Sequence, residues 1–184
     1  MQIDRIFFPT KTLGPGKRLS IWTIGCKRQC KNCSNPELWE ENPDKDINIS
    51  DIISIIKMHK NEIEGITITG GEPFLQHSEL HLLLKELNNL DFYDIIVFTG
   101  FSYSELSENL DYKKCLEYIG VLIDGEYVDE LNNNIGLRGS SNQNIIILKE
   151  SLKKLYHNSD IQQRESQIIN LNNSIMSIGI PVRQ

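Results

Sequence analysis

Three of the four cysteines in this chain lie within eight consecutive residues, at Cys26, Cys30 and Cys33, in the pattern C-x3-C-x2-C. They follow the apolar stretch 19–24, which is typical of a strand, and Gly25 ends that stretch. Cysteine thiolates are ligands for zinc and for iron–sulfur clusters. The sequence therefore indicates a metal site on a loop at the end of a strand.

A closed zinc site and a complete iron–sulfur site both need a fourth ligand. The remaining cysteine, Cys115, lies in a helical stretch and is expected to be a small core residue. His77 and His81 are four residues apart, but their polar neighbours are typical of a surface helix rather than a metal site. A zinc site would have to recruit one of these residues or another distant histidine. We favour an iron–sulfur cluster in which three thiolates hold three irons and the fourth iron is left for an external ligand.

Length and charge limit the possible classes of protein. The chain has 184 residues and a net charge of −6. We expect a single domain over residues 1–184, with a core over about 15–150 and a polar C-terminal extension over 151–184. A mildly acidic chain argues against a nucleic-acid surface, and the sequence has neither the roughly 20 apolar residues of a membrane helix nor a signal-peptide pattern. We therefore expect a cytoplasmic protein.

Strands and helices are expected to alternate along the chain. Short apolar or β-branched stretches predict strands over 3–8, 19–24, 65–69, 94–99, 119–124 and 144–149, and a last strand over 175–182. Apolar residues at helical spacing predict helices over about 51–61 with Ser50 as its N-cap, about 76–89, 103–108 and 111–118. Residues 151–173 are polar and weakly patterned, so we expect a helical or partly mobile segment there.

This alternation predicts βαβ units and a parallel sheet, in which ligands bind at the carboxyl ends of the strands. The cysteine loop, Gly70-Gly71, Thr99-Gly100 and Asp124-Gly125 each follow a predicted strand. We expect these segments to converge on one rim of the sheet.

The cysteine motif, followed by Gly70-Gly71-Glu72-Pro73 after the next strand, resembles the radical S-adenosylmethionine (SAM) superfamily, in which that strand ends in a GGEP motif. Further stretches are similar to the activating enzymes of anaerobic ribonucleotide reductase, which are glycyl-radical activases. These stretches are residues 33–37, 98–101, 122–128 and 138–143. The resemblance covers roughly residues 15–145.

The resemblance implies an α/β fold that is an incomplete TIM-like βα barrel, with a [4Fe-4S] cluster and SAM as cofactors. Cys26, Cys30 and Cys33 would ligate the cluster. Gly70, Gly71, Glu72 and Pro73 would hold the amino group of SAM, and Thr99 would also lie at the cofactor site.

Two further residues receive weaker assignments from the same resemblance. Asp124 would lie near the SAM carboxylate and help to hold a monovalent cation, or would be a plain turn aspartate. Arg138 would meet the SAM carboxylate or a partner chain, or would lie in a solvated loop. The sequence departs from the relatives at Glu126, where they often have a lysine, and many radical SAM proteins have an aromatic residue in place of Asn32.

The activity implied is reductive cleavage of SAM to a 5′-deoxyadenosyl radical, which abstracts a glycine Cα hydrogen from a partner anaerobic ribonucleotide reductase. Flavodoxin or ferredoxin would supply the electron, and neither nucleic acid nor membrane would be a partner. One alternative is a radical SAM enzyme acting on a peptide or a small metabolite, such as a 7-carboxy-7-deazaguanine synthase, because Ser34 follows the third cysteine. A zinc-binding interaction module is a second alternative.

Overall fold

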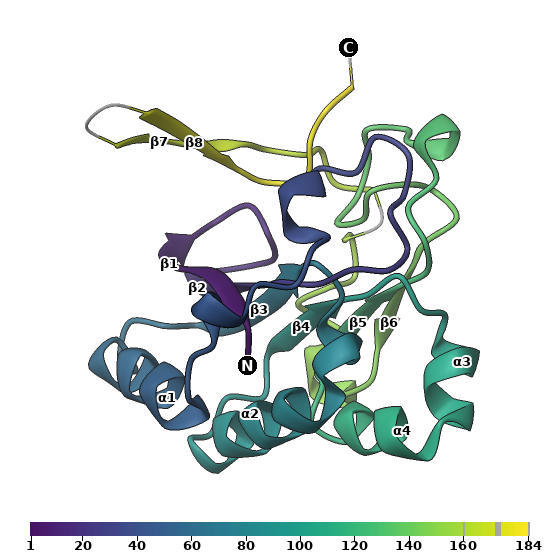
Figure 1. Ribbon diagram of the computed structural model, residues 1–184. Coiled ribbons are helices and arrows are strands. Elements are labelled where there is room, and N and C mark those ends of the chain that lie inside the picture. Colours follow the sequence, from purple (N-terminus) through teal and green to yellow (C-terminus); the bar gives the residue numbers. More distant parts are fainter. Residues whose placement is uncertain (160, 172–173, 184) are drawn as a thin grey trace.

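The computed structural model describes residues 1–159, 161–171 and 174–183. Its centre is a six-stranded mixed sheet in which the strands lie in sequence order (Figure 1). The strands are β1 (Ile3–Thr10), β2 (Arg18–Thr23), β3 (Gly65–Gly70), β4 (Ile95–Phe98), β5 (Val121–Asp124) and β6 (Asn144–Ile147). Strands β2 to β5 run parallel, and β1 and β6 pair antiparallel at the two edges. The predicted α/β class is confirmed, and the predicted parallel pairing holds for β2 to β5 but not for the two edge strands.

The helices lie together on one side of this sheet, while the long loops lie on the other (Figure 1). The helices are α1 (Ile49–Met58), α2 (His77–Asn89), α3 (Tyr103–Glu108) and α4 (Leu110–Leu116). Four leucines of α2, at the predicted spacing, are fully buried against the sheet: Leu80, Leu83, Leu84 and Leu87. Among the helices described, none is long and apolar enough to cross a membrane.

The predicted bounds of the first helix are wrong at both ends. Asn48, rather than Ser50, occupies the N-cap position of α1, and Ser50 lies within its first turn. The helix ends at Met58, three residues earlier than expected. Ile52, Ile53 and Ile56 form the buried face of α1, so the predicted helical periodicity is correct. The polar residues at either end of the helix did not indicate where it begins and ends.

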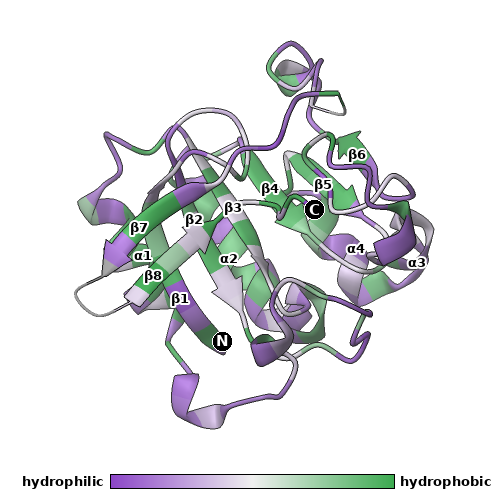
Figure 2. Ribbon diagram, turned by 90° about the horizontal axis from the view of Figure 1, so that it is seen from above, coloured by the Kyte–Doolittle hydropathy of each residue, from purple (hydrophilic) through white to green (hydrophobic). Residues whose placement is uncertain are grey.

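Part of the segment expected to be helical or partly mobile over 151–173 belongs instead to a second, two-stranded sheet. This sheet is a hairpin of β7 (Gln167–Leu171) and β8 (Ser174–Ile178), and it lies beside β1 and β2 (Figures 1 and 2). The predicted last strand therefore ends at Ile178 instead of 182. Residues 160, 172 and 173 of the segment lie outside the described residues.

A buried ion pair ties the amino ends of the parallel strands together. The Arg18 guanidinium is fully buried and contacts the Asp94 carboxylate at 2.7 Å. Its Nε donates to the hydroxyl of Thr67 at 2.7 Å, and a second nitrogen donates to the carbonyl of Ile66 at 2.6 Å. The hydroxyl of Tyr156 donates to Asp94 at 2.5 Å, so residues beyond β6 share the same carboxylate. Loss of one partner would leave a buried charge without compensation.

We predict that Asp94→Ala lowers the free energy of unfolding by about 3–5 kcal/mol, because Arg18 then has no buried counterion. Urea denaturation measures this change. Asp111→Ala, which removes an exposed pair with Lys114, is the control and should change stability little. Equal effects of the two substitutions would contradict the assigned role of Arg18.

Candidate iron–sulfur site

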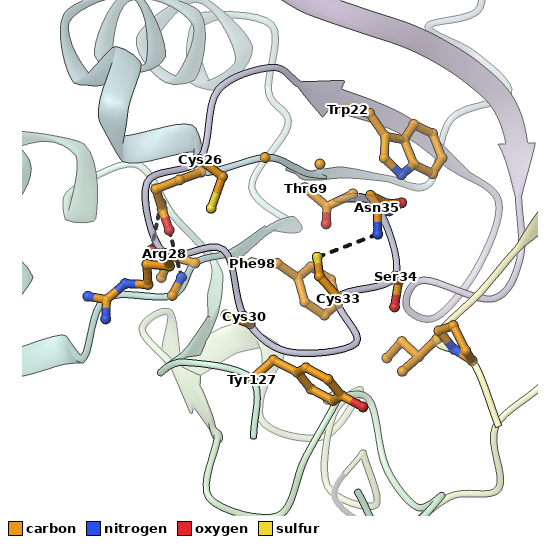
Figure 3. A pocket seen from close by; sticks show the side chains of 18 of the residues that line it. Trp22, Cys26, Arg28, Cys30, Cys33, Ser34, Asn35, Thr69, Phe98 and Tyr127 are labelled. Carbon is orange, nitrogen blue, oxygen red and sulfur yellow. Dashed lines mark hydrogen bonds between the residues drawn. The ribbon is translucent and has the colours of Figure 1, made fainter. Parts of the chain in front are cut away.

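The cysteine loop leaves the end of β2 through residues with left-handed backbone. Gly25 has φ +93°, and Gln29 and Asn32 have φ +48° and +56°. These conformations coil the loop, so that Cys26, Cys30 and Cys33 all line one cavity, as Figure 3 shows. All three cysteines are half-buried and unbridged.

The turn after β3 lies directly against the start of this loop. The main-chain N–H of Glu72 donates to the carbonyl of Gly25 at 2.7 Å, and that of Gly71 donates to the carbonyl of Thr23 at 2.8 Å. A Cβ on Gly71 would lie 2.4 Å from the Gly25 oxygen, and one on Gly70 would lie 2.4 Å from the Thr23 nitrogen. Both glycines are therefore required by the close approach of the two backbones.

The Glu72 side chain is buried and has partners for both of its oxygens. One oxygen accepts from the N–H of Phe74 at 3.1 Å and from the hydroxyl of Thr99 at 2.8 Å. The other accepts from the N–H of Gly100 at 2.7 Å. Burial raises the pKa of Glu72, although these hydrogen bonds and the Arg28 charge act in the opposite direction. The carboxylate thus joins the ends of β3 and β4 at the cavity wall.

An acidic segment after β5, residues 126–130, holds the opposite side of the cysteine loop. Asn32 donates to the Asp129 carboxylate at 2.6 Å. Lys31 pairs with Glu130 at 2.7 Å, and Arg28 lies 3.7 Å from Glu126. Sequence reasoning missed this contact. The only available signal was a basic loop and an acidic segment about one hundred residues apart.

The cavity has a volume of about 200 Å³. Its wall includes the three loop cysteines and, of the other predicted site residues, Gly70, Gly71, Glu72 and Thr99. It also includes residues that we did not predict to lie there. These further lining residues include Arg28, Ser34, Asn35, Trp39, Phe98, Tyr127, Gly139, Gln143 and residues 177–181.

The remaining predicted site residues lie behind this wall. Pro73 is buried at the start of a short 3₁₀ helix. Asp124 is also buried, and its carboxylate accepts from the N–H of Tyr103 at 2.6 Å and from the side-chain amide of Asn144 at 2.8 Å. Arg138 donates to the carbonyl of Gln143 at 3.0 Å. None of the three lines the cavity, so their roles toward a cofactor stay predictions.

The sulfur atoms have surroundings that suit an iron–sulfur cluster. The N–H of Asn35 points at the Cys33 sulfur at 3.5 Å, a contact of the kind that tunes cluster sulfurs. Burial raises the pKa of Cys26, and burial together with the Glu126 carboxylate raises the pKa of Cys30 to about 11. Cluster binding must therefore displace protons from these thiols. Among the residues that the structure describes, no three potential ligands converge on a single ion.

The other candidate ligands are elsewhere. Cys115 is fully buried in the core, as expected, where its thiol contacts the carbonyl of His77 at 3.5 Å. The His77 ring packs against the Tyr112 ring, and His81 packs against Tyr118. None of these side chains lines the cavity. The cavity therefore presents three thiols, without Cys115 as a fourth.

Comparison with known proteins defines the class. The family model described as a 4Fe-4S single cluster domain matches residues 12–146. All three loop cysteines and most of the cavity wall fall within that range. The lining residues outside it are Arg5 and residues 177–181. The protein is thus a 4Fe-4S single cluster domain protein.

The relatives narrow this class. The chain is 27% identical over 154 residues to the anaerobic ribonucleoside-triphosphate reductase-activating protein of Enterobacteria phage T4, covering 79% of this chain and 93% of that one. It is 31% identical over 146 residues to the protein of the same name from Haemophilus influenzae, covering 74% and 92%. The chain belongs to the family of anaerobic ribonucleoside-triphosphate reductase-activating proteins.

Two other likenesses are more partial. The chain is 38% identical over 79 residues to the pyruvate formate-lyase-activating enzyme of Staphylococcus epidermidis, covering 40% of this chain and 32% of that one. Among solved structures, QueE from Escherichia coli is similar with a TM-score of 0.46 and 20% identity, covering 54% of this chain and 52% of that one. That likeness is too slight to indicate a shared activity.

We predict that Glu126→Gln makes Cys30 of the cluster-free protein react severalfold faster with iodoacetamide at pH 8. The reason is that loss of the neighbouring carboxylate lowers the pKa of Cys30 from about 11, so more reactive thiolate forms below that pH. Mass spectrometry of alkylated peptides measures the rate. Glu130→Gln, which faces Lys31, is the control, and equal rates for both variants would contradict the proposed electrostatic contact.

Proposed function

We propose that this protein is a radical SAM enzyme that generates a glycyl radical in a partner anaerobic ribonucleoside-triphosphate reductase. The observation that carries the proposal is the cavity wall that Cys26, Cys30 and Cys33 share with the Gly70-Gly71 turn. The names of the family relatives support the identity of the partner. The name of a second relative, a pyruvate formate-lyase-activating enzyme, supports a glycyl-radical enzyme as the class of partner.

In this proposal Cys26, Cys30 and Cys33 would hold a [4Fe-4S] cluster and leave one iron for SAM. When bound, the reduced cluster would supply one electron to the sulfonium of SAM, and the broken carbon–sulfur bond would give methionine and a 5′-deoxyadenosyl radical. The main chain of Gly70 and Gly71, with Glu72 and Pro73, would hold the amino group of SAM. Glycine is suited to this task because it lets a ligand approach the backbone closely.

The residues of the chain would orient the cofactor and limit access of water. Phe98 and Tyr127 place aromatic surface in the cavity wall. Thr99 lines the cavity, and its hydroxyl donates to the Glu72 carboxylate. We therefore propose that Thr99 acts on the cofactor by positioning Glu72. Asp124 would act from behind the wall by fixing the main chain of Tyr103.

The segment 138–143 would reach the site through residues other than Arg138. Gly139 and Gln143 line the cavity. The side-chain oxygen of Gln143 accepts from the N–H of Gly139 at 2.8 Å, and its nitrogen donates to the carbonyl of Gly125 at 2.7 Å. Arg138 supports this arrangement by donating to the carbonyl of Gln143, and we propose that this is its route of action on the cofactor or partner.

We further propose that the open six-stranded sheet is an incomplete βα barrel within a single domain over residues 1–184. The opening would admit a loop of the partner protein, because a glycine Cα–H must reach the 5′ carbon of SAM. A cytoplasmic flavodoxin or ferredoxin would supply the electron.

The test mixes the anaerobically reconstituted protein with SAM, dithionite and the host's anaerobic ribonucleotide reductase. We expect a glycyl doublet in the electron paramagnetic resonance (EPR) spectrum and formation of 5′-deoxyadenosine. We predict that Cys26→Ala abolishes both signals because one cluster ligand is lost, whereas Cys115→Ala, a buried core substitution, leaves them largely intact. SAM cleavage without a glycyl radical would favour the peptide or small-metabolite alternative, and equal loss in the two variants would refute the ligand assignment.

A further inference from the structure

The β7–β8 hairpin and the residues after it lie outside the family match. The match ends at residue 146, and the two full-length relatives named above align with 79% and 74% of this chain. Residues 167–183 therefore lie beyond the range that the family model matches. Nevertheless, Ser177, Ile178, Gly179, Ile180 and Pro181 line the same cavity as the cysteines.

Apolar contacts fix one end of this segment. Ile178 is 2% exposed and belongs to the same buried cluster as Leu13, Trp22 and Leu38. The hydroxyl of Thr12 donates to the carbonyl of Ile178 at 2.9 Å. Residues 177–181 therefore begin from an anchored strand end beside β2.

Polar contacts fix the other end. Arg183 forms an ion pair with the Asp129 carboxylate and donates to the Asp129 carbonyl at 2.9 Å. The side chain of Asn134 donates to the carbonyl of Arg183 at 2.9 Å and accepts from its N–H at 2.7 Å. Arg164 donates to the carbonyl of Pro181 at 2.9 Å and to that of Gly139 at 3.0 Å. We call the contacts of Arg183 with Asp129 and Asn134 the latch.

The latch joins residues 177–181 to the cysteine loop. Asp129 is 4% exposed, and its carboxylate accepts from both Arg183 and Asn32, which lies between Cys30 and Cys33. The segment therefore spans the cavity between two fixed points, one beside β2 and one on the residue that holds the cysteine loop. Because both of its ends are held, the segment has a fixed position in the cavity wall.

We propose that residues 177–181 form a specificity-determining wall that admits the extended, side-chain-free backbone of a glycine loop and excludes bulkier segments. This inference rests on the proposed function. Residues 177–181 contribute a serine, two isoleucines, a glycine and a proline to the cavity wall, so this side of the cavity carries no charged side chain. The charged lining residues, Arg5, Arg28 and Glu72, come from other elements. The uncharged surface of residues 177–181 selects the entering segment by its shape rather than by its charge, which suits a glycine as the target of the radical.

The test uses the double variant Asn134→Ala/Arg183→Ala, which removes the latch without changing a cavity-lining residue. Lys153→Ala, which removes an exposed pair with Glu150, is the matched control. Hydrogen exchange of the amides in residues 177–180 reports whether the segment is released. 5′-Deoxyadenosine formed without partner reports the cofactor site, and glycyl radical formed per 5′-deoxyadenosine reports the coupling to the partner.

We expect faster exchange, SAM cleavage without partner within about twofold of wild type, and coupling to the partner lowered about fivefold or more, with a raised KM for the partner. The control should match wild type in all three measurements. Unchanged exchange would refute the latch, and faster exchange with unchanged coupling would refute the wall. If SAM cleavage without partner and coupling to the partner both fell, residues 177–181 would belong to the cofactor site, and their proposed role toward the partner would be refuted. A wild-type protein that cleaves SAM but forms no glycyl radical would refute the proposed function, and the wall with it.

Discussion

The contact between the cysteine loop and the turn after β3 is the constraint on which the site depends. The Glu72 N–H donates to the carbonyl of Gly25, and there is no room for a Cβ on either Gly70 or Gly71. Together with the hydrogen bond from the Gly71 N–H to the carbonyl of Thr23, this contact holds the proposed SAM-binding turn against the start of the cysteine loop. The Glu72 carboxylate extends the same restraint to β4 through Thr99 and Gly100.

The parallel sheet provides the geometry in which this contact can form. Because β2, β3, β4 and β5 are parallel and adjacent, the residues that follow each strand meet at one edge. The amino ends are held by the buried Arg18–Asp94 pair, and the carboxyl ends are left for the loops. At the far side, the acidic residues 126–130 complete the support of the cysteine loop. The loop is thus held from two sides by elements distant in sequence.

The sequence predicted those features that have a local cause. Apolar periodicity gave the leucine face of α2, and apolar or β-branched stretches gave the strands of the main sheet. Features with a long-range cause were missed. Asn32 and Asp129 are 97 residues apart, and nothing in either neighbourhood indicates their hydrogen bond. The strand β7 was missed as well, because it lies in a weakly patterned segment and depends on pairing with β8, whose Ile178 belongs to the same buried cluster as Trp22. Asp124 lies at the end of β5 as expected, but its carboxylate accepts from Asn144 and does not line the cavity. Arg138 does not line the cavity either, and it donates to the carbonyl of Gln143.

The central claim is that a glycine hydrogen of the partner passes directly to the 5′ carbon derived from SAM in this cavity. The most direct measurement is mass spectrometry of 5′-deoxyadenosine formed with a partner reductase whose glycines carry deuterium at Cα. We predict one deuterium in each 5′-deoxyadenosine that is coupled to a glycyl radical. Formation of the radical with no deuterium in 5′-deoxyadenosine would contradict the account.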